Sequence, residues 1–325
     1  MRVHANDGIS TQAVQSLTDE GFEVTTHHVP QDELVAFINA ERVEVLLVRS
    51  ATKVRKDLID ACPSLKLIGR GGVGLDNIDV AHAQARGIAV VNTPGSSSVS
   101  VAELVMAHLF GMMRSLHKAN RSMPVEGRTR FKELKKEYEK GFELRGKTLG
   151  IIGFGRIGQW TARYALGVGM RVVYVDSITT VEAIELEIGG QTVRVPTKRV
   201  ELDDLLQQAD AISLHVPAQP DGSPLLGAAE LARVKPGVVI VNTARGGSID
   251  ESALLAAVNE GRVRAAALDV FVGEPEPRAD LLTCPALSLS PHIGAATAEA
   301  QGRVGDELVE RIVSWREQTS MVDRG

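Results

Sequence analysis

The chain has few cysteines and no excess of positive charge, and each shortage excludes a class of protein. Cys62 and Cys284 are the two cysteines among 325 residues, too few for a disulfide framework and not in the C-x-x-C spacing of a metal or redox site. We therefore predict a reducing, cytoplasmic location and no metal. Because 36 basic residues stand against 41 acidic ones, for a formal net charge of −5, we also predict no nucleic-acid partner.

Long apolar runs are missing as well. No segment approaches the roughly 18 consecutive apolar residues that can span a bilayer, and the first residues lack the apolar core of a signal peptide. We predict no membrane partner for this chain.

Short runs rich in β-branched residues alternate with helical patterns along most of the sequence. Because apolar residues fill these runs continuously, they predict parallel strands that are buried on both faces. The fold class is therefore α/β with two doubly wound parallel-sheet domains. We expect strands at 3–5, 23–26, 45–48, 67–69 and 88–91 in the first sheet, and at 148–153, 171–175, 211–214, 238–241, 265–268 and 287–289 in a second, six-stranded sheet.

Two long helical patterns connect these domains. One runs from Val99 to Lys118, with Ser98 or Ser100 as a candidate amino-terminal cap. The other, 297–315, follows the last strand and should return to the first domain. We thus predict a discontinuous substrate-binding domain of residues 1–98 and 295–325 with a flavodoxin-like sheet, and an inserted Rossmann dinucleotide-binding domain of residues 99–294. A hairpin is expected within 181–200, and the charged stretch 128–140 should be a solvated helix face.

A glycine motif identifies the cofactor site. Gly153, Gly155 and Gly158 form G-x-G-x-x-G directly after a predicted strand and at the start of a helix. The first glycine permits a tight turn, the second lets a pyrophosphate approach the backbone, and the third lets the helix pack against the strand. The N–H groups at Arg156 and Ile157 would face the pyrophosphate.

The next predicted strand ends at Asp176. A carboxylate at this point can accept hydrogen bonds from the adenosine ribose hydroxyls, and it would repel a 2′-phosphate. No arginine follows directly, since the next residues are Ser177, Ile178 and Thr179. The cofactor is therefore predicted to be NAD.

Three further predicted strands of the second sheet are followed by Arg245, Glu274 and His292. In open α/β sheets, ligands bind beyond the carboxyl ends of the strands. A guanidinium that grips a carboxylate, an imidazole that moves a proton and a carboxylate that holds the imidazole suit the oxidation of a hydroxy acid. Of the eight histidines, His292 alone has such a setting: His27 and His28 should be exposed, and His108 and His117 should be packing or interface residues.

These segments together resemble the D-2-hydroxyacid dehydrogenases over essentially the whole chain, and within them the D-3-phosphoglycerate dehydrogenases of serine biosynthesis. The segments that carry the resemblance are VRSATKV (48–54), GRGGVGLDNID (69–79), NTPGSSSVSVAEL (92–104), GKTLGIIGFGRIG (146–158), VNTARGGSIDE (241–251), ALDVFVGEP (267–275) and SPHIGA (290–295).

The resemblance implies a role for each matching residue. Arg245 would bind the substrate carboxylate and carbonyl, His292 would be the acid/base, and Glu274 would pair with His292. The backbone N–H groups of Gly72, Val73 and Gly74 would hold the carboxylate, and the helix from Val99 would build a homodimer. Further cofactor contacts are implied for His215, Val216, Pro217, Thr243, Ala244 and Asp269.

Arg49, with Ser50 beside it, and Arg70 follow predicted strands of the first domain. Two guanidinium groups at strand ends indicate that the substrate carries a phosphate. With the resemblance, this makes 3-phosphoglycerate and 3-phosphohydroxypyruvate the leading pair. A glyoxylate or hydroxypyruvate reductase is the near alternative. An NAD(H)-sensing corepressor, which binds the cofactor in order to recruit partners, is a remote one that a turnover assay separates. Because the sequence ends at Gly325, we expect no regulatory carboxyl-terminal domain.

Overall fold

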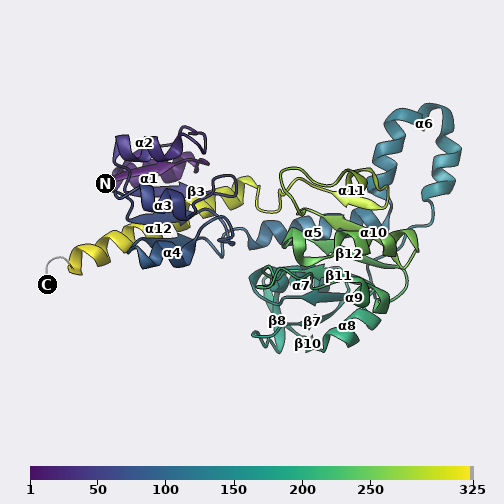
Figure 1. The fold of residues 1–325 in the computed structure, drawn as a ribbon. Coiled ribbons are helices and arrows are strands. Elements are labelled where there is room, and N and C mark those ends of the chain that lie inside the picture. The colour runs from purple at the N-terminus through teal and green to yellow at the C-terminus, as the bar shows by residue number, and fades with distance from the viewer. Residues whose placement is uncertain (323–325) are drawn as a thin grey trace. The chain divides into compact units, whose positions relative to one another are not determined.

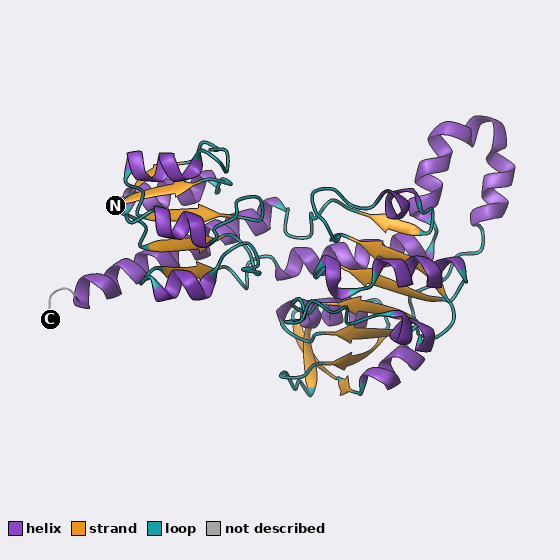
Figure 2. Cartoon of the chain, in the orientation of Figure 1, coloured by secondary structure: helices purple, strands orange, loops and turns teal. Residues whose placement is uncertain are grey.

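The computed structural model describes residues 1–322, which form two compact units (Figure 1). Unit 1 consists of Met1–Ser97 and the chain from Ala295 onward, and unit 2 consists of Ser98–Gly294. Unit 2 is therefore inserted into unit 1. Both units contain a parallel sheet with helices on both of its faces, as Figure 2 shows by the purple helices around the orange strands.

Unit 1 is built on five parallel strands in the order β2-β1-β3-β4-β5, which is the flavodoxin-like order. Leu46 and Ile68 pack into the core on one face of the sheet, and Leu47 and Leu67 into the core on the other. The predicted strands are confirmed, with ends that differ by one residue at most. The strands are β1 (Arg2–Ala5), β2 (Glu23–Thr25), β3 (Val45–Val48), β4 (Leu67–Arg70) and β5 (Ala89–Asn92), and the helices are α1 (Thr11–Asp19), α2 (Leu34–Glu41), α3 (Lys56–Ala61) and α4 (Val80–Ala85).

The last helix, α12 (Ala298–Val322), completes unit 1. The Thr297 hydroxyl accepts a hydrogen bond from the Ala300 N–H at 3.1 Å, which caps the first turn. Leu308 and Ile312 enter the core that contains β1 and β3 residues. The predicted return of the chain to the first unit is therefore confirmed.

Unit 2 contains seven parallel strands in the order β10-β7-β6-β11-β12-β13-β14, the order of a Rossmann sheet with one further strand. The prediction of six strands was wrong because β10 (Lys198–Arg199) has two residues, both charged, and so carries no apolar signal. The other strands of the sheet are β6 (Thr148–Ile152), β7 (Arg171–Val175), β11 (Ala211–Leu214), β12 (Val238–Asn242), β13 (Val263–Leu268) and β14 (Leu287–Leu289).

The order of the strands reverses at β6, which pairs with β7 on one side and with β11 on the other. Ligands of open α/β sheets bind at such a switch point. The helices around this sheet are α7 (Arg156–Gly167), α8 (Leu202–Gln208), α9 (Ala228–Arg233), α10 (Glu251–Asn259) and α11 (Ala279–Thr283), with one 3-10 turn at Gly246–Ser248.

The helix predicted from Val99 to Lys118 is in fact two helices. The first, α5 (Ser98–Met113), ends before Ser115, whose left-handed backbone (φ 52°) separates it from α6 (Leu116–Tyr138). Ser98 and Ser100 lie inside α5, so the expectation that one of them caps the helix was wrong. Within residues 1–322 no single helix is long and apolar enough to cross a bilayer, and α5 and α6 pass that test only as a pair bent by 62°.

The helix α6 forms an arm that extends from the rest of unit 2 (Figure 1). Its backbone leaves the helical region at Arg130 (φ −122°, ψ 24°), and the Ser122 and Tyr138 hydroxyls meet across the bend at 2.8 Å. The charged stretch 128–140 is exposed as predicted, apart from the buried Leu134 and the partly buried Tyr138.

The predicted hairpin is confirmed as β8 (Ala183–Ile188) and β9 (Gln191–Pro196). Its two-residue turn consists of Gly189 (φ 58°) and Gly190 (φ 79°), and this pair of positive φ values is typical of the tight turns that match the twist of a hairpin.

We expect alanine substitutions at the two ends of α7 to change stability in opposite directions. A Cβ atom at Gly158 would lie 2.2 Å from the Gly153 carbonyl oxygen, so Gly158→Ala should lower the free energy of unfolding by about 1–3 kcal/mol. A Cβ atom at Gly167 meets nothing within 4 Å, so Gly167→Ala should raise it by about 0.5–1 kcal/mol. Urea denaturation measures both free energies of unfolding. An equal decrease in the two variants would contradict the prediction and show that the two ends of α7 are packed alike.

Candidate active site

Arg245, Glu274 and His292 lie in the loops that follow β12, β13 and β14. These three strands are neighbours in the sheet and run parallel, so their carboxyl ends share one edge. The strand pattern placed these residues after three separate strands, and the contact between Glu274 and His292 that the resemblance implied is present in the structure.

His292 and Glu274 form a hydrogen-bonded pair. The imidazole Nδ1 lies 2.8 Å from Glu274 Oε2, and Glu274 Oε1 accepts the Phe271 N–H at 2.8 Å. Because a carboxylate only accepts hydrogen bonds, Nδ1 is the protonated ring nitrogen. The side chain of His292 is 43% exposed, which leaves Nε2 as the nitrogen that can exchange a proton with a ligand.

A buried carboxylate supports the turn of His292. Asp269 is 1% exposed; its Oδ1 accepts the Ser290 hydroxyl at 2.6 Å and the Ile293 N–H at 2.9 Å, and its Oδ2 accepts the Gly294 N–H at 2.8 Å. His292 itself has left-handed backbone (φ 54°), which costs energy for a residue with a Cβ atom. The implied contact between Asp269 and the nicotinamide remains a prediction, while the structure assigns its carboxylate to this turn.

The loop that carries Arg245 is held by Asn242, which was not singled out in the sequence. Asn242 is fully buried; its Nδ2 donates to the Arg245 carbonyl at 2.8 Å, and its Oδ1 accepts the Ala244 N–H at 3.0 Å. A Cβ atom at Gly246 would lie 2.2 Å from the Phe271 carbonyl, so the loops after β12 and β13 touch backbone to backbone. An amide residue that ends a fully buried strand was the available sequence signal.

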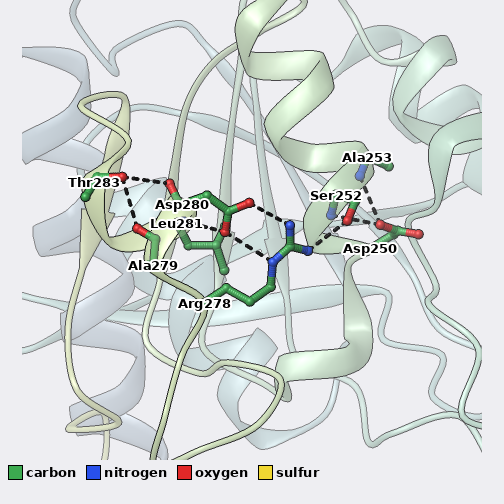
Figure 3. Close-up of polar contacts among 8 residues, drawn as sticks. All are labelled: Asp250, Ser252, Ala253, Arg278, Ala279, Asp280, Leu281 and Thr283. Atoms are coloured by element: carbon green, nitrogen blue, oxygen red, sulfur yellow. Dashed lines mark hydrogen bonds and ion pairs between the residues drawn. The ribbon is translucent and has the colours of Figure 1, made fainter.

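The first turn of α10 holds both ends of the loop that carries Glu274. At one end, Glu251 Oε1 accepts the Val272 N–H at 2.8 Å. At the other, Arg278 donates to the Ser252 hydroxyl at 2.7 Å and binds Asp280 through two nitrogens, as Figure 3 shows. Asp250 caps the same helix by accepting the N–H groups of Ser252 and Ala253, also drawn in Figure 3. None of these supports was predicted.

The glycine loop lies between β6 and α7. Phe154, its second residue, is fully buried and stacks on Tyr174 at 3.9 Å, which fixes the loop to the sheet. A Cβ atom at Gly153 would lie 2.4 Å from the His215 carbonyl oxygen, so the loop after β11 adjoins this loop directly. The predicted residues Val216 and Pro217 follow His215 in that second loop.

Several features of this region fit a dinucleotide. A Cβ atom at Gly155 meets nothing within 4 Å, so the backbone there is open to close approach. The first turn of α7, at Arg156 and Ile157, has neither an acidic residue nor a side-chain cap. Among the described residues, the buried Thr243 hydroxyl and the buried His215 Nδ1 have no hydrogen-bond partner, as expected for groups that face a ligand.

Asp176 lies at the end of β7 beside the glycine loop. Its Oδ2 accepts the Phe154 N–H at 2.6 Å, and its Oδ1 accepts those of Ile178 and Thr179 at 2.9 and 2.6 Å. Partial burial by itself would raise the pKa of Asp176, but these backbone hydrogen bonds lower it below its ordinary value. The carboxylate is thus ionised at neutral pH, and Oδ2 retains a lone pair for a further donor.

His215 is excluded as an acid/base group. Burial lowers the pKa of His215 to about 3, so its ring is neutral at ordinary pH. Its Nε2 lies 2.9 Å from the Ser213 hydroxyl and 3.3 Å from that of Thr161. The other histidine predictions agree with the structure, since His27 and His28 are exposed and His108 is buried.

The predicted substrate residues belong to unit 1. Arg49 and Ser50 follow β3, while Arg70 ends β4 and Gly72–Gly74 follow it. The loop after β3 is clamped twice: the Asp7 carboxylate accepts the N–H groups of Arg49 and Thr52, and Asn77 Nδ2 donates to both of their carbonyls at 2.6 Å. A Cβ atom at Gly72 would collide with the Arg70 guanidinium, which therefore packs against the backbone of the segment after β4.

Comparison with known proteins agrees with this architecture. Residues 106–294 match the family of D-isomer specific 2-hydroxyacid dehydrogenases, NAD binding domain. The chain is 47% identical over 315 residues to a hydroxypyruvate reductase of Thermotoga maritima, which covers 96% of this chain and 97% of that protein. It is 40% identical over 312 residues to a D-3-phosphoglycerate dehydrogenase of Methanocaldococcus jannaschii, covering 96% of this chain but 57% of that protein.

Among solved structures, a glyoxylate reductase from Paecilomyes thermophila superposes with a TM-score of 0.82 at 29% identity, over 97% of this chain and 94% of that one. The family match spans more than half of the chain, and the Thermotoga protein is similar over almost its full length. The chain therefore belongs to the D-2-hydroxyacid dehydrogenases and is an NAD-dependent enzyme of that family.

Proposed function

We propose that this enzyme interconverts 3-phosphoglycerate and 3-phosphohydroxypyruvate. The observation that carries the proposal is the pair of arginines in unit 1: Arg49 follows β3, Arg70 ends the neighbouring strand β4, and their side chains lie next to Gly71 and Gly72, respectively. Backbone N–H groups at Gly72–Gly74 suit one anionic group, the substrate carboxylate, and two guanidinium groups suit a second, the phosphate. Serine biosynthesis is the corresponding pathway assignment.

Hydroxypyruvate or glyoxylate is the second candidate substrate. It is favoured by the similarity to the Thermotoga hydroxypyruvate reductase, which extends over 97% of that protein. The two candidates differ in the phosphate, so Arg49 and Arg70 are the residues that distinguish them.

In the reaction we propose, NAD when bound takes up or supplies the hydride at substrate C2. Arg245 binds and orients the substrate carboxylate through its planar guanidinium. His292 Nε2 removes the hydroxyl proton in oxidation and returns it to the carbonyl oxygen in reduction. Glu274, at 2.8 Å from Nδ1, keeps the ring in the orientation that presents Nε2 and stabilises the protonated imidazole.

A homodimer and a cytoplasmic location are part of the same proposal. Most side chains of α5 are buried within unit 2, so the apolar surface left for a second copy of this chain lies on α6 and beside it. The mass of the assembly in solution tests the homodimer. The exposed apolar side chains on α6 and near its two ends are Phe110, Leu116, Met123, Val125, Phe131 and Phe142.

His292→Ala should lower kcat by about 10²- to 10⁴-fold and leave the dissociation constant of NADH unchanged. The imidazole acts on the proton and has no part in holding the nucleotide. Glu274→Gln should lower kcat by less, because an amide oxygen can still accept the Nδ1 proton. Fluorescence titration with NADH and steady-state rates measure the two quantities, and loss of NADH binding with normal turnover per bound complex would reverse these roles.

Asp176 should make the enzyme prefer NAD over NADP. At about 4 Å and an effective dielectric near 20, two unit charges repel by roughly 4 kcal/mol, and half of that after screening is still a preference of more than tenfold. Asp176→Asn should narrow the ratio of kcat/KM for NADH to that for NADPH, while Glu260→Gln, a control at an exposed carboxylate of the same unit, should leave it unchanged. Equal use of both cofactors by the wild-type enzyme would refute this assignment.

Initial rates with NADH and 3-phosphohydroxypyruvate, hydroxypyruvate or glyoxylate test the substrate assignment. We expect the phosphorylated substrate to have the highest kcat/KM. Arg49→Ala or Arg70→Ala should raise KM for it by about 10- to 150-fold and affect hydroxypyruvate much less, since only the former loses a charge-assisted contact. Arg86→Ala, an exposed arginine of the same unit, is the control. Equal increases in KM for both substrates would favour hydroxypyruvate or glyoxylate as the substrate.

A further inference from the structure

His108 is a buried histidine of α5 that no role in cofactor or substrate binding accounts for. It is 8% exposed and lies between two serines of the β14 region. Its Nδ1 is 3.0 Å from the Ser288 hydroxyl, and its Nε2 is 3.1 Å from the Ser290 hydroxyl. Both ring nitrogens are therefore engaged with the strand that leads to His292.

The protonation of this group follows from its partners. The Ser290 hydroxyl donates its one proton to Asp269 Oδ1 at 2.6 Å, because a carboxylate can only accept. Ser290 must then accept from His108, so Nε2 carries the ring proton. In a neutral imidazole Nδ1 is the acceptor, and it receives the Ser288 proton. The four groups form one chain of donors that runs from Ser288 to Asp269.

This assignment requires a neutral imidazole. Burial lowers the pKa of His108, and the nearby charge of Asp269 opposes that shift only in part. The ring is therefore neutral at ordinary pH, and the direction of the chain of donors is determined.

The end of this chain is the turn that holds His292. Asp269 accepts the N–H groups of Ile293 and Gly294, the two residues that directly follow His292. A Cβ atom at Gly294 would lie 3.1 Å from Asp269 Oδ2 and 3.4 Å from Val101, so α5 also packs against this turn. Left-handed backbone at a histidine persists only where its surroundings enforce it.

We propose that His108 is a positioning residue for the acid/base histidine: by donating to Ser290 it directs the Ser290 proton to Asp269 and so holds the turn in which His292 is presented. His108 touches neither substrate nor cofactor in this proposal. The inference rests on the proposed function in one respect, the assignment of His292 as the acid/base.

The test compares His108→Leu, which cannot hydrogen-bond, with His108→Gln, whose side-chain N–H can reach the position of Nε2. We expect His108→Leu to lower kcat about tenfold or more with an unchanged dissociation constant for NADH, and His108→Gln to recover most of the loss. His117→Leu is the matched control, because His117 is a partly buried histidine of the next helix, α6, whereas the ring that reaches Ser288 and Ser290 is that of His108. Ser290→Ala replaces His108→Leu if the latter does not fold.

A second readout does not depend on turnover. Amide hydrogen exchange at Ile293 and Gly294 should be about tenfold faster in His108→Leu or Ser290→Ala, with exchange in β12 unchanged. Faster exchange in an enzyme that reduces no 2-oxo acid would support the positioning role and defeat the proposed function. Unchanged exchange, or a loss of kcat that His108→Gln does not recover, would overturn the positioning role whatever the substrate.

Discussion

Asp269 carries a carboxyl group that is almost completely removed from water, and the geometry of the segment that carries His292 depends on the hydrogen bonds that this group receives. A buried carboxylate is costly unless hydrogen-bond donors surround it. Its three donors, Ser290, Ile293 and Gly294, all come from the segment that follows β14. The pairing of β13 with β14 therefore does more than extend the sheet, because it brings this segment to the carboxylate that must be satisfied.

The loops that carry Arg245 and Glu274 also support each other. Gly246 lets the Arg245 loop touch the backbone at Phe271, and Phe271 in turn donates its N–H to Glu274. The first turn of α10 fixes both ends of that second loop through Glu251 and Ser252. Because these loops contact one another, displacement of one of them would move the others.

Much of the fold could be predicted from the sequence, because parallel strands and glycine motifs have local sequence signals. Continuous apolar runs located all but one strand of the two sheets, and the exception, β10, consists of Lys198 and Arg199. The break between α5 and α6 was missed because the apolar spacing continues past Met113 to Leu116. The support by Asp269 was missed because its three partners lie more than 20 residues away, and only pairing of β13 with β14 brings them together.

The residues that we assign to catalysis and those that we assign to substrate recognition lie in different units. Every group assigned to proton transfer and to the cofactor lies in unit 2, whereas Arg49 and Arg70 lie in unit 1. Asp7 and Asn77 hold the Arg49 loop, and at Arg49 they bind the backbone N–H and carbonyl, not the side chain. If Arg49 binds the substrate anion as we propose, its replacement would alter the anion that is recognised without disturbing a hydrogen bond of the loops after β12, β13 and β14. In the function that we propose, the buried network of unit 2 constrains the reaction, and the loop that carries Arg49 selects the substrate.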